Sequence, residues 1–278
     1  MPHEFSPLLK SLNTINCRTF TSVNTCPIKK KSPMKSILVA DNRAELLATL
    51  EPILKHWGYR VLSTRSAEQV ATFLQESKPC MLVIGEEMLA DPGLGLDKKV
   101  IATIDNGDLP CIALRQDGAK DLVVTPNETM DVPLELFGLF SFIQRKVEKH
   151  PRQNLRLRVK LPGMYSISED DFILADVLSL SMKGLFFKTA TRLKECDRLT
   201  VVFPLLGHCT EIEVKSTVLY SIEPGSENNY FQGFGVGFDD ISDHHSQQLR
   251  QFIRDCFLKE VSSSQNGVGD FVRENLKN

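Results

Sequence analysis

Two short stretches decide how this chain is interpreted: Arg152-Gln153-Asn154-Leu155-Arg156 and Ser179-Leu180-Ser181-Met182-Lys183-Gly184. The first places two arginines four residues apart, and the second ends in a glycine that follows two serines. A guanidinium presents a planar fork of donors that fits a phosphate or the O6/N7 edge of a guanine. A glycine lets the backbone approach a ligand closely. Together the two stretches indicate a site for an anionic nucleotide.

The charge around the two arginines differs from that of the whole chain. Between Arg145 and Lys160 there are seven Lys or Arg residues and one acid, Glu148, whereas the 278 residues together carry a net charge of −2. The isoelectric point near 6.3 argues against binding to bulk nucleic acid. We therefore interpret the basic run as a feature for a small ligand or a protein partner. The alternative is a solvated basic linker made by Arg152, Arg156 and Arg158.

Residues 150–258 resemble a PilZ domain, the family that binds the bacterial second messenger cyclic di-GMP. That family carries R-x-x-x-R at its entrance and [D/N]-x-S-x-x-G on an early strand, and Phe234–Phe238 followed by a helix is similar to its closing strand and helix. The resemblance implies a small antiparallel β-barrel with a C-terminal helix over residues 149–262. It also implies a cyclic di-GMP site made by Arg152, Arg156, Ser179, Ser181 and Gly184.

Ser179 departs from the family pattern, because it stands where the family has Asp or Asn. The family's Asp or Asn is expected to hold a guanine edge, and a good bidentate base contact contributes roughly 1–3 kcal/mol of discrimination. A serine hydroxyl makes one such bond but not two in a fixed plane. From a low-micromolar site, worth about 8 kcal/mol, the loss weakens binding about five- to a hundredfold. We expect binding to survive in weakened form.

The second half of the chain is rich in strand patterns. A helix is expected after Ser242, a plausible N-cap, with an apolar stripe that faces the barrel. Short apolar runs separated by turns are typical of a small barrel. The expected strands are Phe172–Val177, Gly184–Lys188, Leu199–Phe203, Ile212–Ile222 and Phe234–Phe238.

The first half alternates strand and helix patterns, which predicts a doubly wound α/β fold with a parallel sheet. A final helix is expected from Leu134 to Ile143. Only seven residues separate Leu114 from Leu122, so either one helix is deleted there or the two strands form a hairpin on Asp117-Gly118. The expected strands are Ile37–Ala40, Tyr59–Leu62, Met81–Ile84, Cys111–Leu114 and Leu122–Val124.

Residues 34–148 resemble a response-regulator receiver domain that has lost its chemistry. Asp41-Asn42 matches the family's acidic pair only half-way. The phospho-acceptor position falls at Gly85, the Thr/Ser position near Arg115 and the Lys position at Thr125. Phosphoryl transfer to a carboxylate needs that carboxylate and a Mg²⁺ site built by acids. We therefore predict a flavodoxin-like pseudo-receiver domain that serves packing and docking and has no phosphotransfer chemistry.

Glu86 and Glu87 follow the third expected strand, and we interpret them as solvated surface residues rather than metal ligands. We find no catalytic constellation and predict that the protein is not an enzyme and holds no metal or cofactor. Residues 1–33 are expected to be a disordered tail or to precede the true start at Met34, and residues 263–278 a flexible tail. Without an apolar run of eighteen residues, a signal peptide or a C-x-x-C pair, a cytoplasmic location is expected.

These observations lead to one functional hypothesis and one alternative. The hypothesis is a cyclic di-GMP effector in which ligand binding at the basic linker reorients the pseudo-receiver and the barrel. The new arrangement presents a surface to an unidentified protein partner. No nucleic-acid polymer and no membrane span are expected. The alternative is a ligand-independent adaptor for protein–protein interaction whose nucleotide site has degenerated.

Overall fold

The computed structural model describes residues 34–90, 96–116, 122, 124–168, 171–208 and 210–263. The tails predicted at 1–33 and 263–278 lie outside these residues, except for Ser263, which ends the last helix. Within the described part, no helix is both long enough and apolar enough to span a membrane.

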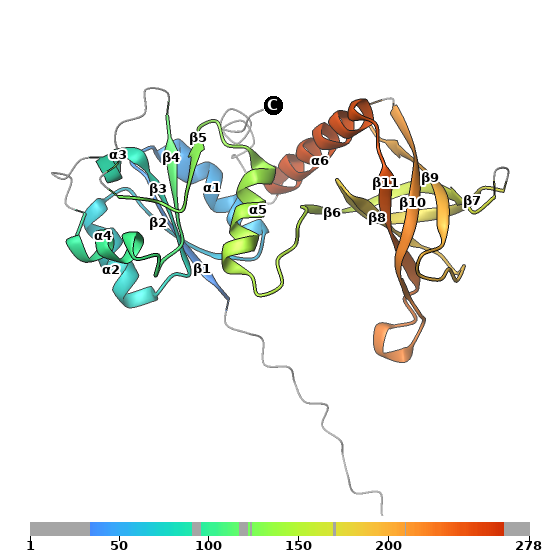
Figure 1. Cartoon of the computed structure of the whole chain (residues 1–278), viewed down its shortest axis with the longest axis horizontal. Helices are drawn as coiled ribbons and strands as arrows, with labels where there is room; N and C mark the ends of the chain where they lie inside the picture. Colours follow the sequence, from blue (N-terminus) through green and yellow to red (C-terminus); the bar gives the residue numbers. More distant parts are fainter. Residues whose placement is uncertain are drawn as a thin grey trace, which may run out of the picture. The chain divides into compact units, whose positions relative to one another are not determined.

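The first domain is built on a five-stranded parallel sheet, as predicted (Figure 1). Its strand order, β2-β1-β3-β4-β5, is that of flavodoxin-like folds, to which receiver domains belong. The inner strands are unbroken apolar runs because helices cover both faces of the sheet. The strands are β1 (Ser36–Ala40), β2 (Arg60–Thr64), β3 (Met81–Gly85), β4 (Cys111–Arg115) and β5 (Glu128–Asp131).

Alternate residues of β1 supply two separate apolar cores. Ile37 and Val39 pack with buried residues of α1 and α5, whereas Leu38 and Ala40 pack with those of α2 and α4. This alternation follows from the two-residue period of a strand and gives the predicted doubly wound arrangement. The helices are α1 (Ala44–His56), α2 (Ala67–Ser77), α3 (Glu86–Ala90), α4 (Lys98–Asp105) and α5 (Leu136–Val147).

The prediction for the fifth strand was wrong. β5 is Glu128–Asp131, and it runs parallel to β4, with Ile112 opposite Glu128. Neither Leu122 nor Val124 lies in a strand, and both pack against the core that lies on the α2 side of the sheet. The apolar side chains of Leu122 and Val124 therefore indicated packing against the core and not extended pairing, and Val123 between them lies outside the described residues. Parallel pairing of β4 and β5 also excludes the hairpin, and the described residues of their connection contain no helix.

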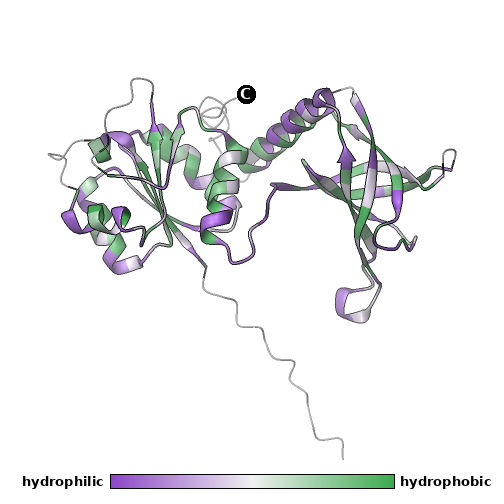
Figure 2. Cartoon of the chain, viewed as in Figure 1, coloured by the Kyte–Doolittle hydropathy of each residue, from purple (hydrophilic) through white to green (hydrophobic). Residues whose placement is uncertain are grey.

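The second domain is a closed antiparallel barrel with the order β10-β11-β8-β7-β6-β9, followed by α6 (Asp243–Ser263). Its centre holds fully buried aromatic side chains, among them Tyr165, Phe187, Phe203 and Phe234. Figure 2 shows hydrophilic and hydrophobic residues interleaved along the barrel strands. The strands are β6 (Arg156–Ser166), β7 (Ile173–Ser181), β8 (Gly184–Lys188), β9 (Arg198–Leu205), β10 (Thr210–Ile222) and β11 (Gly233–Asp240).

Strand β6 was missed, because the run that opens it was interpreted as a basic linker. Leu155, Leu157 and Leu161 are buried, while Arg156 and Arg158 between them are exposed. This alternation is the two-residue period of a half-buried strand. The signal was present in Leu155-Arg-Leu-Arg-Val-Lys-Leu161, where every second residue is apolar. Arg156 is therefore part of the barrel and not of a hinge.

Candidate functional site

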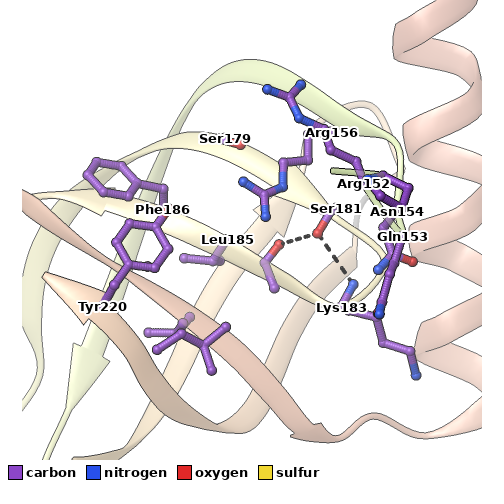
Figure 3. A pocket seen from close by; sticks show the side chains of 15 residues that line it. Arg152, Gln153, Asn154, Arg156, Ser179, Ser181, Lys183, Leu185, Phe186 and Tyr220 are labelled. Carbon is purple, nitrogen blue, oxygen red and sulfur yellow. Dashed lines mark hydrogen bonds between the residues drawn. The ribbon is translucent and has the colours of Figure 1, made fainter. Parts of the chain in front are cut away.

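All five residues of the predicted nucleotide site line one pocket of 410 Å³ on the surface of the barrel (Figure 3). Other residues that line the pocket were not among the predicted contacts, including Gln153, Asn154, Lys183, Phe186, Leu219 and Tyr220. The structure thus brings Arg152 together with Gly235, although these two residues are 83 positions apart in the chain (235 − 152).

The two sequence motifs meet because β6 and β7 are antiparallel neighbours. Arg156 lies opposite Ser181, and Arg158 lies opposite Ser179. Residues directly opposite each other in an antiparallel pair have Cβ atoms roughly 5 Å apart. A ligand that contacts the Arg156 guanidinium is therefore also within reach of the turn that carries Ser181.

The pocket is strongly cationic. Arg152, Arg156 and Lys183 line it and are exposed, and no Asp or Glu is among its described lining residues. In the described part of the chain, none of these three side chains has a carboxylate within salt-bridge distance. Unpaired guanidinium groups at the mouth of a pocket attract anions and hold phosphate through paired hydrogen bonds.

Ser181 builds the turn between β7 and β8. Its hydroxyl donates to the Gly184 carbonyl at 3.0 Å and accepts from the Lys183 backbone N–H at 3.4 Å. A hydroxyl has a single proton to donate, so in this arrangement Ser181 has only acceptor capacity left. Its position fixes the backbone of residues 181–184 at the floor of the pocket.

Gly184 also has a structural role in the barrel. A Cβ on Gly184 would lie 2.0 Å from the carbonyl oxygen of Val236, which is backbone of the neighbouring strand β11. Only glycine therefore lets β8 pair closely with β11, where Gly184 lies opposite Gly237. The close approach made possible by this glycine is to another strand. The same holds for Gly233 of β11, whose Cβ would lie 2.0 Å from the Phe187 carbonyl oxygen of β8.

The linker that leads into the pocket is anchored on the first domain. The backbone N–H of Arg152 donates to Gln144 Oε1 on α5 at 3.0 Å, and the Gln144 amide donates to the Tyr59 hydroxyl at 3.0 Å. That hydroxyl donates to Glu148, which also accepts from Lys35 at 2.8 Å. Burial acts to raise the pKa of Glu148, but the hydrogen bonds from Lys35 and Tyr59, with the charges of Lys35 and Arg152, lower it overall.

Comparison with protein families decides the nature of the barrel: residues 149–255 match the model of the PilZ domain. The barrel is a PilZ domain. The match covers the strands that form the pocket and most of α6. A comparison with curated proteins finds no match.

Several solved structures resemble parts of the chain. The motility inhibitor MotI/DgrA of Bacillus subtilis is 18% identical over 40% of this chain and 53% of its own, with a TM-score of 0.35. YcgR of Escherichia coli, solved in complex with c-di-GMP, is 14% identical over 41% of this chain and 49% of its own, with a TM-score of 0.34. This chain thus spans about half the length of these two proteins. A signal receiver domain of an HD domain-containing protein from Pseudomonas fluorescens is 18% identical over 41% of this chain and 95% of its own, with a TM-score of 0.36.

The acidic position of the receiver-like domain is occupied by an internal ion pair. Asp41 is fully buried and receives Arg43 Nη2 at 2.7 Å on one oxygen and Arg43 Nε at 2.8 Å on the other. The hydrogen bond to Asp41 is the main cause of a raised pKa of Arg43, so the guanidinium stays charged. A Cβ on Gly85 would lie 2.5 Å from Asp41 Oδ2. The carboxylate therefore fills the space in which an acceptor side chain would begin.

Two expectations for this end of the sheet were wrong. Glu86 is buried and not solvated: its Oε1 accepts from the Gln116 backbone N–H at 2.8 Å, and its Oε2 is enclosed with no hydrogen-bond partner among the described residues. Glu87 is exposed, as expected. Since β5 ends at Asp131, the position before the following proline is Val132 and not Thr125. Neither Val132 nor Thr125 is a lysine, so the lysine of the receiver family is absent at either position. Among the described residues, no three His, Cys, Asp or Glu side chains gather in a way that fits a metal.

Proposed function

We propose that this protein is a cyclic di-GMP effector whose ligand binds in the pocket of the PilZ domain. The observation that carries the proposal is that the cross-strand pair Arg156 and Ser181 places the two motifs on the wall of a single cationic pocket that has no lining carboxylate among its described residues. The ligand has two phosphates, and the two arginines supply paired donors for them. Arg152, Arg156, Ser179, Ser181 and Gly184 are the proposed contacts.

The Ser181 hydrogen bonds refine the proposed roles. The Ser181 hydroxyl donates to the Gly184 carbonyl, so it contacts a phosphate as a donor only if that bond is exchanged. The side chain of Lys183 also lines the pocket and is an alternative donor. We therefore assign the main share of phosphate binding to Arg152 and Arg156, and the shaping of the floor to Ser181 and Gly184.

Ligand binding is proposed to act on the linker through Arg152. The side chain of this residue lines the pocket, while its backbone N–H is held by Gln144 of α5. A ligand that draws the Arg152 side chain toward Arg156 pulls on the residues that join α5 to β6. The two domains then change their relative orientation, to the extent that the ligand binds the two arrangements with different affinity.

Isothermal titration with the full chain tests binding, and Arg158→Ala is a matched control. Arg156 and Arg158 are both exposed arginines of β6, but only Arg156 lines the pocket. Arg156→Ala is expected to remove binding and Arg158→Ala to retain it. Equal loss in both variants would show that general positive charge, and not this pocket, attracts the ligand.

Small-angle scattering tests the coupling to the linker. Cyclic di-GMP is expected to change the scattering profile of the wild-type chain. Gln144→Leu keeps the Arg152 side chain but removes its backbone anchor, so this variant is expected to bind the ligand without the change in profile. An unchanged wild-type profile at saturating ligand would contradict the coupling and leave binding as a separate result.

The second candidate function is a ligand-independent adaptor. The feature that favours it is a group of exposed apolar side chains where β7 begins, Phe172, Ile173 and Leu174, of which Leu174 is 79% exposed. Exposed apolar groups of this kind mark surfaces for protein contact. If the wild-type chain and a Ser179→Asp variant both fail to bind cyclic di-GMP, the adaptor function is preferred.

A further inference from the structure

Three neighbouring strands place two aromatic rings over one glycine at the edge of the pocket. Gly235 of β11 lies opposite Phe186 on β8 and opposite Tyr220 on β10. Phe234 and Val236 point into the barrel and are buried, so Gly235 belongs to the outer face. A Cβ on Gly235 would lie 2.5 Å from Tyr220 Cε1. The missing side chain is therefore what lets the Tyr220 ring lie on the strand.

The rings form a short stack. The centroids of Phe186 and Tyr220 are 6.2 Å apart with planes inclined by 25°, and those of Phe186 and Phe231 are 5.5 Å apart with planes inclined by 13°. Phe186 is buried within this stack, whereas Tyr220 is 37% exposed. The Tyr220 ring is thus held in place by Phe186 and remains accessible to solvent.

A β-bulge turns Tyr220 outward. The register of β10 with β11 shifts between Val218 and Tyr220, so that β10 has one extra residue there. Val218 is buried, while Leu219 and Tyr220 are both exposed, which places two consecutive side chains on the outer face. Bulges commonly redirect a side chain in this way beside a functional site. Without the extra residue, Tyr220 and the buried Val218 would share one face of the strand.

The pocket therefore has two chemically different sides, as Figure 3 shows. Arg152 and Arg156 lie on one side, and the rings of Phe186 and Tyr220 lie on the other. Guanidinium groups suit a phosphate, and an open aromatic ring suits the face of a base. Ser179, which is opposite Phe186 in the β7–β8 pair, lies between the two sides and has no amide or carboxylate for a base edge.

We propose that Tyr220, supported by Phe186, is the base-stacking surface of this pocket, and that the ligand class is purine cyclic dinucleotides selected with little preference for guanine. The inference rests on the proposed function. Stacking recognises the π-face that every base has, whereas an Asp or Asn at position 179 would recognise the edge that distinguishes guanine. A site with the ring and without the edge contact binds through stacking and phosphate contacts, and these are shared by cyclic di-GMP and cyclic di-AMP.

The test is the affinity of the full chain for both cyclic dinucleotides, measured by titration. The wild-type chain is expected to bind the two with affinities within about tenfold of each other, since one lost bidentate contact removes most of the base discrimination. Tyr220→Leu keeps apolar bulk but has no ring, and its affinity for both ligands is expected to be about five- to a hundredfold lower than that of the wild type. Tyr220→Phe is expected to bind like the wild type. Ser179→Asp is expected to favour cyclic di-GMP selectively.

Tyr230→Leu is the matched control, because Tyr230 is 72% exposed and does not line the pocket. Its affinity for both ligands is expected to equal that of the wild type. Thermal unfolding of each variant separates a loss of binding from a loss of fold, and the comparison of the two ligands with the wild-type chain tests the base selection whatever the stability of Tyr220→Leu.

Failure of the inference differs from failure of the proposed function. If the wild-type chain binds cyclic di-GMP and Tyr220→Leu binds it equally well, the stacking surface is refuted while the function stands. Binding of cyclic di-GMP with no measurable binding of cyclic di-AMP refutes the relaxed base selection in the same way. If the wild-type chain binds neither dinucleotide, the proposed function falls, and the inference falls with it.

Discussion

Arg156 and Ser181 lie directly opposite each other on strands β6 and β7. They are 25 residues apart in the sequence, and each belongs to a different motif. The pairing of β6 with β7 brings the two motifs to one pocket, which the spacing within either motif would not do. If β6 and β7 paired in another register, Arg156 would not face the turn that carries Ser181.

Gly184→Ala is expected to destabilise the barrel. The new Cβ would lie 2.0 Å from the Val236 carbonyl oxygen, and this contact is with backbone that has no flexible end to move. Overpacking of this kind typically costs about 1–3 kcal/mol. The measurement is the unfolding free energy in urea. Gly207→Ala is not a suitable control because of its positive φ, so the surface variant Glu211→Ala serves instead. A stability equal to that of the wild type would show that β8 and β11 are less closely packed than described.

Arg43→Ala is expected to destabilise the first domain by about 3 kcal/mol, because it leaves the fully buried carboxylate of Asp41 without its cation. Removing both partners in Asp41→Ala/Arg43→Ala is expected to cost less than Arg43→Ala alone, since no buried charge is left. Urea unfolding of the two single variants and the double variant gives the coupling. Additive effects would mean that Asp41 and Arg43 do not depend on each other.

Acetyl phosphate is expected to leave the chain unmodified, as shown by mass spectrometry. Gly85→Asp is expected to remain unmodified as well, because Asp41 occupies the space beside residue 85 and Arg43 neutralises its charge. An acyl phosphate on the introduced carboxylate of that variant would contradict this explanation of the lost chemistry, and one on the wild-type chain would contradict the pseudo-receiver prediction.

Glu148 is expected to make stability depend on pH in the acid range. Its folded pKa is lower than its unfolded pKa, which is about 4.3. Its contribution to stability is therefore fully present above the unfolded pKa and is lost as the pH falls through the lower folded value. Glu148→Gln is expected to be less stable than the wild type at about pH 6 and to approach it near pH 3. A constant difference across this range would mean that the ionised carboxylate of Glu148 does not hold Lys35 and Tyr59.

The sequence predicted most of the elements of both domains, and the resemblance to receiver domains also implied the flavodoxin-like strand order of the first sheet. The long apolar runs of β1, β3 and β4 are buried on both faces, and such strands are visible without structural information. β6 was missed because its exposed residues are arginines, which drew attention to charge instead of to alternation. β5 was missed because Glu128–Asp131 has few buried side chains, whereas the buried Val124 belongs to a loop.

The candidate site could be predicted only in part, for a similar reason. The two motifs identified five residues of the pocket, namely Arg152, Arg156, Ser179, Ser181 and Gly184. The motifs do not give the strand register that brings these residues together. Tyr220 joins the pocket through a bulge in β10, and the position of an extra residue in a strand has no signal in the local pattern. The pair of Asp41 and Arg43 likewise depends on a buried environment that composition does not reveal.

The decisive measurement for the cyclic di-GMP pocket is isothermal titration of this ligand into the full chain and its Arg156→Ala variant. We expect saturable binding by the wild type, in the micromolar range or up to about a hundredfold weaker because of Ser179, and no binding by the variant. Absence of heat with the wild type up to about 1 mM ligand, or equal binding by Arg156→Ala, would contradict the assignment of this pocket as a cyclic di-GMP site.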